Sequence, residues 1–536
     1  MSVAAQPPGK DRPVTRYAWY ALGMMTVVHM LSFVDRQILS ILAEQIRKDL
    51  QLTDAQLGFL YGTAFAAFYT LFGIPLGRLA DRWRRGRLMA IGLALWSAMT
   101  ALSGFATSYA LLAVARLGVG VGEASVSPAA ISMQADLFPQ AVRARANAIF
   151  STGVYLGMGL SLPLGGAISQ RWDRAFGDNG PLGLAGWQAA FIGVGLPGLL
   201  VAVWVWSLRE PQRLGIHGEP LVASYDGAWR SFFDELFALI PPLTLWSVSR
   251  YRGELLRNVL IMAGLAAVTT LLILWTGDIA QWLIVGVAAY AVASWVQVLR
   301  LRDAPTFRLI WANPAVVMAL IGFGSLALIT YSVGFWAAPY AIRTFHLTAP
   351  AVGLAIGIPA AAASGLGVLL GGWISDGWRR SNPRGRIYTC MIAPLMTPPL
   401  LVAQYLAPDF TTFAILSAGV YAASSMYLGS AIAALQELVL PRMYGTLSAT
   451  YIMGNTMIGL CLGPYGTGKV ATVTGDLRLG VFSALLAAPI ALICLWWVSR
   501  SAARLEGSML ERAQSAGEHI ALDPRAGAAG VTESVS

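Results

Sequence analysis

The chain has 536 residues, of which 56% are hydrophobic and 12% are charged, and its formal net charge is +10. Ordinary globular domains carry about 25% charged residues, so this composition excludes a soluble protein and indicates a polytopic membrane protein. The basic residues lie in short loops between apolar runs, which is typical of a membrane protein and argues against a nucleic-acid partner. Cys390, Cys461 and Cys494 show no CxxC spacing, so we predict no disulfide framework, no metal site and no cofactor.

Apolar runs long enough to cross a bilayer, about 20 residues each, recur along the whole chain. The first half contains six of them, near residues 17–43, 57–79, 88–107, 109–134, 146–169 and 186–207. Two extra runs follow, near 256–276 and 279–299, joined by a short turn. Six more complete the chain, near 314–342, 350–375, 386–406, 410–438, 444–471 and 478–500. We therefore predict an all-α polytopic membrane protein with about 14 spans.

The distribution of Lys and Arg predicts the orientation. Because the expected number of spans is even, both termini lie on one side, and most of the 37 basic residues fall on that side. This bias predicts cytoplasmic termini in an integral, multi-pass protein of a bacterial-type inner (plasma) membrane.

Five segments follow from these spans. They are a cytoplasmic tail at 1–16, a six-helix bundle at 17–207, a cytoplasmic linker at 208–312 containing the inserted hairpin at about 256–299, a second six-helix bundle at 313–500, and a cytoplasmic tail at 501–536. Pro241-Pro242 breaks the linker, so we expect an amphipathic piece on the membrane surface there. Both tails are polar, and we expect them to be disordered.

Four charged residues lie inside predicted spans. A charge at the bilayer centre costs at least about 3 kcal/mol, so such a residue marks a partner or a hydrated pathway. Arg116 and Glu123 share a helix face and lie about 10 Å apart along its axis, too far for a direct pair. We expect Asp35 to be the partner of Arg116, and Arg36 that of Glu123 or of a substrate anion. The alternative is a salt-bridge network that only joins the first span to the fourth.

An internal repeat relates the two halves. Gly77-Arg-Leu-Ala-Asp81-Arg82-Trp-Arg-Arg85 in the first half is echoed by Gly372-Trp-Ile-Ser-Asp376-Gly-Trp-Arg-Arg380 in the second. A second echo pairs Asp136-Leu-Phe-Pro139 with Glu437-Leu-Val-Leu-Pro441. Parallel repeats of this kind are one architecture that secondary transporters use.

These motifs resemble a known family. The loop from Gly77 to Arg87 is similar to the signature between helices 2 and 3 of the major facilitator superfamily, and the run from Arg116 to Ala124 is similar to its helix 4 motif. Within the superfamily, Asp35-Arg36 combined with Gly122-Glu123-Ala124 most resembles spinster-type transporters. The resemblance implies a major facilitator fold of two six-helix bundles, to which this chain adds a transmembrane hairpin.

The resemblance also implies roles for individual residues. Asp35 and Glu123 would be proton or substrate residues, with Arg36 and Arg116 as their charge partners. The loop residues would govern conformational switching, and they are Gly77, Asp81, Arg82 and Arg85, with Asp376 as the echo of Asp81. An acid at this position can also meet the positive end of a neighbouring helix, and the plainer alternative is a basic loop that only sets topology. His29 is a packing histidine or a proton relay.

The function we predict is secondary active transport by alternating access, coupled to protons, of an amphiphile or organic anion. Spinster resemblance implies a lysolipid or sphingolipid-like cargo. A multidrug-type proton antiporter and a sugar-acid symporter are the alternatives within this class, and a non-transporting membrane receptor is a remote one. We expect no enzyme, because HExxH, GxSxG and Walker patterns are missing. The expected partners are a small-molecule substrate, protons and the lipid bilayer, and we expect a monomer.

Overall fold

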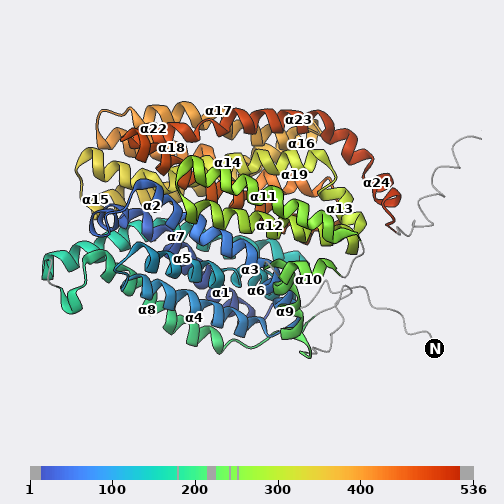
Figure 1. Cartoon of the computed structure of the whole chain (residues 1–536), viewed down its shortest axis with the longest axis horizontal. Coiled ribbons are helices and arrows are strands. Elements are labelled where there is room, and N and C mark those ends of the chain that lie inside the picture. Colours follow the sequence, from blue (N-terminus) through green and yellow to red (C-terminus); the bar gives the residue numbers. More distant parts are fainter. Residues whose placement is uncertain (1–13, 178–179, 214–224, 241–242, 250–252, 519–536) are drawn as a thin grey trace, which may run out of the picture.

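The computed structural model describes residues 14–177, 180–213, 225–240, 243–249 and 253–518. All secondary structure in this part of the chain is helical, and thirteen helices in it are long and apolar enough to cross a membrane. These helices run roughly along the long axis of the molecule (Figure 1), which confirms the all-α polytopic fold class.

The first six spans form what we call the N-terminal half. Its elements are α1 (Arg16–Asp49), α2 (Asp54–Tyr61), α3 (Thr63–Arg82), α4 (Arg85–Ser103), α5 (Tyr109–Glu123), α6 (Val126–Leu137), α7 (Gln140–Phe176), the short η1 (Pro181–Gly183) and α8 (Gly186–Trp206). Two of the spans are interrupted helices, since α2 and α3 meet at Gly62, and α5 ends at Glu123 before α6 begins.

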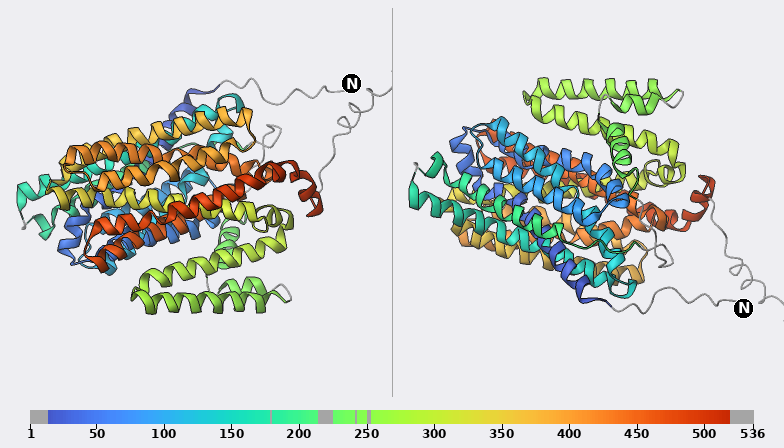
Figure 2. Two further views of the ribbon diagram at one scale, coloured as in Figure 1. Left: turned by 90° about the horizontal axis from the view of Figure 1, so that it is seen from above. Right: turned by 90° about the horizontal axis from the view of Figure 1, so that it is seen from below.

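The linker follows and carries the inserted hairpin. Its elements are α9 (Ala228–Leu239), α10 (Leu243–Ser249), the hairpin helices α11 (Glu254–Thr276) and α12 (Ile279–Arg302), and α13 (Ala304–Ile310). The hairpin stands beside the bundle in both views of Figure 2. In the most apolar window of α11 no residue is buried, so α11 faces the lipid and α12 contacts the rest of the protein.

The last six expected spans form the C-terminal half. Its elements are α14 (Pro314–Phe345), α15 (Ala349–Val352), the π-helical η2 (Gly353–Gly357), α16 (Ile358–Ser381), α17 (Gly385–Tyr405), α18 (Phe410–Ser425), α19 (Tyr427–Gln436), η3 (Pro441–Met443), α20 (Tyr444–Gly454), the π-helical η4 (Asn455–Leu460), α21 (Cys461–Thr474), α22 (Leu477–Ala484) and α23 (Ala487–Gly507), followed by α24 (Met509–Ser515). The expected span near 444–471 is helical, as α20, η4 and α21, but it is not among the thirteen apolar helices.

The linker and the tails agree only in part with expectation. α9 is amphipathic, because its apolar and polar residues segregate to different faces of the helix. It packs on α3, and Trp229, Phe233 and Phe237 are partly exposed. Pro241-Pro242 lies outside the described residues, as do residues 1–13 and 519–536. A wholly disordered C-terminal tail is wrong, because α23 runs to residue 507 and α24 follows it. The limits of the five predicted segments stay predictions.

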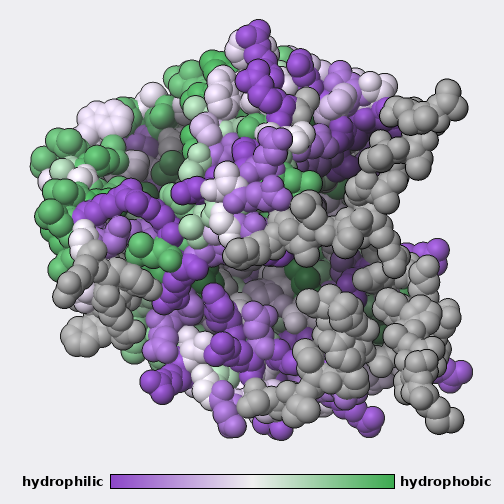
Figure 3. Space-filling model, turned by 90° about the vertical axis from the view of Figure 1, so that its right-hand side faces the viewer, coloured by the Kyte–Doolittle hydropathy of each residue, from purple (hydrophilic) through white to green (hydrophobic). Residues whose placement is uncertain are grey.

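We call the side on which α1 begins and α23 ends the terminal side, and the opposite side the far side. The terminal side is largely hydrophilic (Figure 3), as expected where helix ends leave the membrane. The two halves touch through α1 with α14, α2 with α21, and α7 with α15, η2 and α16. The approach is closest toward the far side, where a Cβ on Gly58 of α2 would lie 2.3 Å from the carbonyl oxygen of Pro464 on α21.

Candidate functional site

The four charged residues predicted inside the membrane lie together between α1 and α5. We call Asp35, Arg36, Arg116 and Glu123 the central charge cluster. All four are buried, and Arg116 is 0% exposed. Arg36 donates from Nη2 to Oε2 of Glu123 at 2.7 Å, and the same oxygen accepts from the hydroxyl of Ser32 at 2.8 Å. The expected pairing of Arg36 with Glu123 is therefore present.

Small residues on α5 position this cluster. A Cβ on Gly120 would lie 2.4 Å from the carbonyl oxygen of Phe65, so only glycine lets α5 approach α3 this closely. Gly122 is equally confined, since its Cβ would lie 2.7 Å from the carbonyl oxygen of Gly92 on α4. Glu123 is the last residue of α5, at the interruption before α6. Interrupted helices near the midplane are a recurrent way to build transporter sites.

Aromatic rings surround the Arg36 guanidinium. Its carbon lies 4.4 Å from the ring centre of Phe65, 4.7 Å from that of Phe33 and 5.4 Å from that of Tyr69. Tyr331 on α14 lies close enough for electrostatic interaction with Arg36, so the C-terminal half also borders the cluster. The Arg36 guanidinium is therefore lined by aromatic rings, which can hold a cation over their faces and can also contact the apolar part of a ligand.

Arg116 does not pair with the Asp35 carboxylate as expected. Its Nη1 donates instead to the backbone carbonyl of Asp35 at 3.3 Å. The Asp35 carboxyl group has Thr100 and Trp96 of α4 beside it, and no ion pair joins it to Arg116 among the described residues. Among the described residues we find no hydrogen-bond partner for Nε and Nη2 of Arg116, Oδ1 of Asp35 or Oε1 of Glu123. The cluster thus keeps open donors as well as open acceptors in a buried place.

His29 lies on α1 but apart from these contacts. Its Nδ1 is 3.1 Å from the carbonyl oxygen of Phe150, and its ring stacks on that of Phe150 at 4.2 Å between centres. This geometry favours the packing histidine over the relay.

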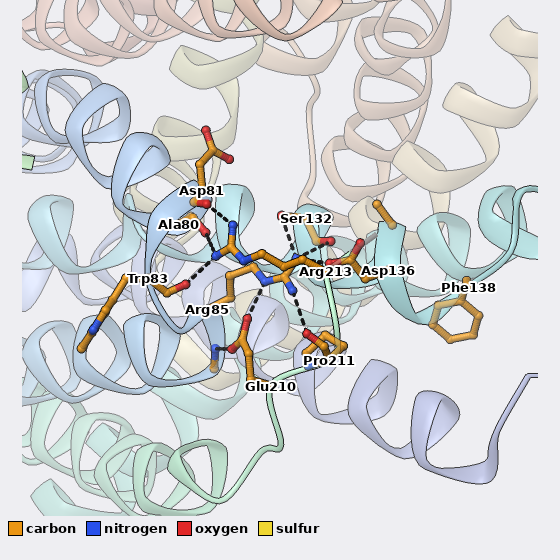
Figure 4. A network of polar contacts seen from close by, with 12 residues as sticks. Ala80, Asp81, Trp83, Arg85, Ser132, Asp136, Phe138, Glu210, Pro211 and Arg213 are labelled. Carbon is orange, nitrogen blue, oxygen red and sulfur yellow. Dashed lines mark hydrogen bonds and ion pairs between the residues drawn. The ribbon is translucent and has the colours of Figure 1, made fainter. Parts of the chain in front are cut away.

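A second polar group lies at the terminal side of the N-terminal half (Figure 4). Arg85 at the start of α4 pairs with Asp136 at 2.6 Å and with Glu210 at 2.7 Å, and it also donates to the carbonyl oxygens of Ser132 and Pro211. Arg85 is buried, so these four partners together satisfy a charge that would otherwise be costly. We call Arg85, Asp136 and Glu210 the N-terminal ion cluster.

The predicted switch residues near α3 take a different arrangement. Arg213 of the linker donates to the carbonyl oxygens of Ala80, Asp81 and Trp83, and so satisfies the end of α3 (Figure 4). We find no ion pair for the side chains of Asp81 or Arg82 among the described residues, and both are exposed.

The remaining two switch residues make few contacts. A Cβ on Gly77 would only touch Pro128 at 4.0 Å, so this glycine is not required by packing. Asp376 is exposed, and its nearest basic group is Arg386 at 3.9 Å.

The C-terminal half repeats the ion cluster. Arg386 at the start of α17 and Arg379 at the end of α16 both contact Glu437, at 3.0 and 2.9 Å, and Arg379 also pairs with Glu506. Glu437 and Glu506 occupy the places of Asp136 and Glu210 in the first half. The sequence echo between Asp136 and Glu437 therefore marks equivalent ion clusters.

A family model for the Major Facilitator Superfamily matches residues 25–338. The chain belongs to this superfamily. It is therefore a membrane transporter in general type, and the predicted superfamily is confirmed. A curated "MFS-type efflux pump" of Mycolicibacterium smegmatis is 28% identical over 511 residues, with 94% of this chain and 97% of that protein covered.

Spinster relatives are found by sequence and by structure. "Protein spinster homolog 1" of Xenopus tropicalis is 24% identical, with 83% of this chain and 71% of that protein covered. The crystal structure of a bacterial homolog to the human lysosomal transporter spinster, inward-facing and unoccupied, matches with a TM-score of 0.70 and 23% identity, covering 92% of this chain and 99% of that one. These matches support the predicted spinster-type branch.

In this structure the N-terminal and C-terminal halves are joined by ion pairs at the far side. Arg343 at the end of α14 donates to Glu44 of α1 at 2.5 Å, and its Nη1 donates to Asp54 of α2 at 2.8 Å. We call these three residues the far-side cluster. Among the described residues, every ion pair between the two halves uses Arg343. On the terminal side the N-terminal ion cluster joins the first half to the linker, and the cluster around Glu437 stays within the second half, so neither links the two halves. The ionic contacts between the halves thus close the far side in this conformation.

Sequence reasoning missed several of these groups. Glu210 and Arg213 lie in a linker whose path the sequence does not predict, and Arg343 was not singled out from the sequence. The one available signal was the Asp136 and Glu437 echo, which pointed to equivalent acids without naming their partners.

Proposed function

We propose that this protein is a proton-coupled secondary active transporter for an amphiphilic or organic-anion small molecule. Segments 17–207 and 313–500 would be the two bodies that alternate access. The observation that carries the proposal is the central charge cluster, in which Arg36 is paired with Glu123 while Arg116 keeps open buried donors. Buried charges of both signs with open hydrogen-bonding capacity mark transport pathways rather than plain packing.

The chemistry follows from the two arginines. An anionic head, carboxylate or phosphate, accepts hydrogen bonds from Arg36 and from the open nitrogens of Arg116. It competes with Glu123 for Arg36, and protonation of Glu123 removes that competitor. Asp35 is a second proton site, since its carboxyl group is buried and its Oδ1 has no hydrogen-bond partner among the residues described. Phe33, Phe65 and Tyr69 would hold the adjoining apolar part of the cargo.

The cargo we propose is lysolipid or sphingolipid-like, by analogy with spinster-type relatives. The second candidate is proton-driven efflux of hydrophobic compounds, which the length of the match to the efflux pump favours. We place the protein in a bacterial inner membrane with cytoplasmic termini, so the closed far side would face away from the cytoplasm, and we propose that it acts as a monomer.

The test is transport by the purified protein in proteoliposomes. Labelled lysophospholipid, glucuronate and a hydrophobic cationic dye are compared, each with and without a pH gradient. We expect D35N and E123Q to lose gradient-driven transport of the accepted substrate, while D35N keeps counterflow, which needs no net proton movement. The exposed far-side carboxylate Asp409 offers the control D409N. Gradient-driven transport by D35N at the wild-type rate contradicts proton coupling through this residue.

A further inference from the structure

A cavity of about 550 Å³ lies between the inserted hairpin and the C-terminal half. One wall comes from α11 and α12, and the other comes from α13, the residue Trp311 that follows it, and Met457 of η4. The volume falls within the range of about 300–1,000 Å³ that ligand pockets occupy. Because α11 faces the lipid, this cavity lies at the edge of the protein and is separate from the central charge cluster.

The polar groups on its wall are hydrogen-bond donors. Arg257 and Arg300 both line the cavity, and no ion pair of either is found among the described residues. Trp311 also lines it, and its buried indole nitrogen has no hydrogen-bond partner in the part of the chain that the structure describes. Gln297 is already used, since its amide nitrogen donates to Glu254 at 2.7 Å and its oxygen accepts from Asn258 at 2.8 Å. The unpaired groups on the wall are therefore all donors, which a hydrogen-bond acceptor would satisfy. Because two of them are guanidinium groups, the matching ligand carries a negative charge.

The donors and the apolar residues lie at different depths. Arg257 is near the start of α11 and Arg300 is near the end of α12, so both belong to the terminal side. From there α12 lines the cavity down to Val285, fifteen residues earlier, which is about 22 Å of helix. Every α12 residue lining this deeper part is Ala or Val. The cavity is thus basic at the membrane surface and apolar toward the midplane.

We propose that this cavity binds an anionic phospholipid from the terminal-side leaflet. The headgroup phosphate would accept from Arg257, Arg300 and the Trp311 indole, and one acyl chain would lie along α12. Basic pockets between transmembrane helices recognise anionic headgroups by the same charge complementarity. A free phosphate ion would leave the apolar depth unfilled, so the lipid is the occupant that fits both ends. This inference does not rest on the proposed transport function, because its readout is lipid binding.

The test is binding of defined lipids to the purified, delipidated full chain. Native mass spectrometry and thermal unfolding compare phosphatidylglycerol, phosphatidylcholine and soluble glycerol phosphate. We expect phosphatidylglycerol to bind and raise the Tm, with neither of the other two doing so. The double variant R257Q/R300Q should weaken this binding at least tenfold, since a hydrogen bond to a charged group is worth about 1.5–3 kcal/mol. A289F, which fills the apolar part, should weaken it as well.

The matched control is R145Q/R384Q, which removes two terminal-side arginines outside the cavity. It should bind phosphatidylglycerol as the wild type does. Equal binding by R257Q/R300Q and wild type overturns the proposal, and so does equal binding of phosphatidylcholine or full stabilisation by glycerol phosphate. If R257Q/R300Q does not fold, A289F provides the test. Unchanged phosphatidylglycerol binding by A289F also overturns the proposal.

Discussion

Removing Arg343 should open the far side. This side chain is the ionic link between the halves in the described part of the chain, and it contacts Glu44 and Asp54 together. Its side chain is 22% exposed, and those of its partners are 7% and 12% exposed. In R343Q the two carboxylates lose the cation that they share, although Glu44 keeps Arg47 at 3.4 Å. They then repel each other, whereas the far-side-open state would hydrate them. The substitution therefore destabilises the closed state more than the open state.

The size of the shift can be bounded. Hydrogen bonds to charged groups contribute about 1.5–3 kcal/mol each, and the partial exposure of this cluster reduces that contribution. We take about 2 kcal/mol for the whole cluster, which corresponds to a shift of about 30-fold in the ratio of open to closed molecules. A transporter that is almost wholly closed on the far side would then show a measurable open fraction.

Distances between spin labels measure that fraction. Thr107 and Thr411 are exposed on the far sides of the two halves, and the three native cysteines are buried, so introduced cysteines can be labelled selectively. We expect R343Q to add a longer distance between labels at these positions. R478Q is the control, because Arg478 lies on the same side but donates to Tyr340 within its own half. A distance distribution unchanged in R343Q, or changed equally in R478Q, would refute the reasoning.

Two further predictions concern stability. In the central charge cluster, E123Q leaves Arg36 buried without its carboxylate and should cost about 3–5 kcal/mol of unfolding free energy, whereas R36Q/E123Q should recover more than about 1 kcal/mol of it. The free energies of unfolding of the wild type, R36Q, E123Q and R36Q/E123Q are measured in mixed micelles. If the effects of R36Q and E123Q simply add in the double variant, the Arg36–Glu123 pair does not stabilise the protein. Between α12 and α13, burial alone would raise the pKa of Asp303, but hydrogen bonds from Arg442 and Thr306 lower it below its ordinary value. Asp303 helps to fix Arg442, which also pairs with Glu518 just after α24. Since the folded pKa is lowered, this contribution of Asp303 is present above about pH 4 and lost as pH falls further. Limited proteolysis after α23 should therefore accelerate below that pH, and a constant rate argues against it.

The sequence predicted the central pairing because it depends on helix geometry. Arg116 and Glu123 are seven residues apart and must share a face, and Arg36 and Glu123 then meet between α1 and α5. The Asp35 pairing was wrong because Arg116 contacts a backbone carbonyl, and a carbonyl is present at every residue. No residue type on α1 signals such a contact. The pattern of residue types therefore predicts ion pairs between helices, but it does not predict hydrogen bonds from side chains to the main chain.

For the loop between α3 and α4, the sequence also did not predict which distant residues are the partners. The family resemblance gave Asp81 and Arg85 a shared role in conformational switching, but it did not name their partners. In the structure Arg85 turns to Asp136 and Glu210, and Arg213 binds the end of α3. Two of these partners come from the linker, whose docking depends on tertiary packing. The span near 444–471 was predicted as apolar, although its helix carries many Gly and Thr residues and contains a π-helical segment.

The arrangement of charges suggests how the site and the far side communicate. The central charge cluster lies in the N-terminal half, so a rocking motion does not by itself break the Arg36–Glu123 pair; a ligand or a proton does. α14 is the element of the C-terminal half that borders this cluster, through Tyr331, and the same helix carries Arg343 twelve residues later, about 18 Å along the axis. Between them the Phe335 carbonyl accepts a hydrogen bond from Ser40 of α1 at 2.6 Å. A cargo that displaces Tyr331 therefore acts on the helix that closes the far side, and we expect cargo binding and loss of Arg343 to shift the same equilibrium.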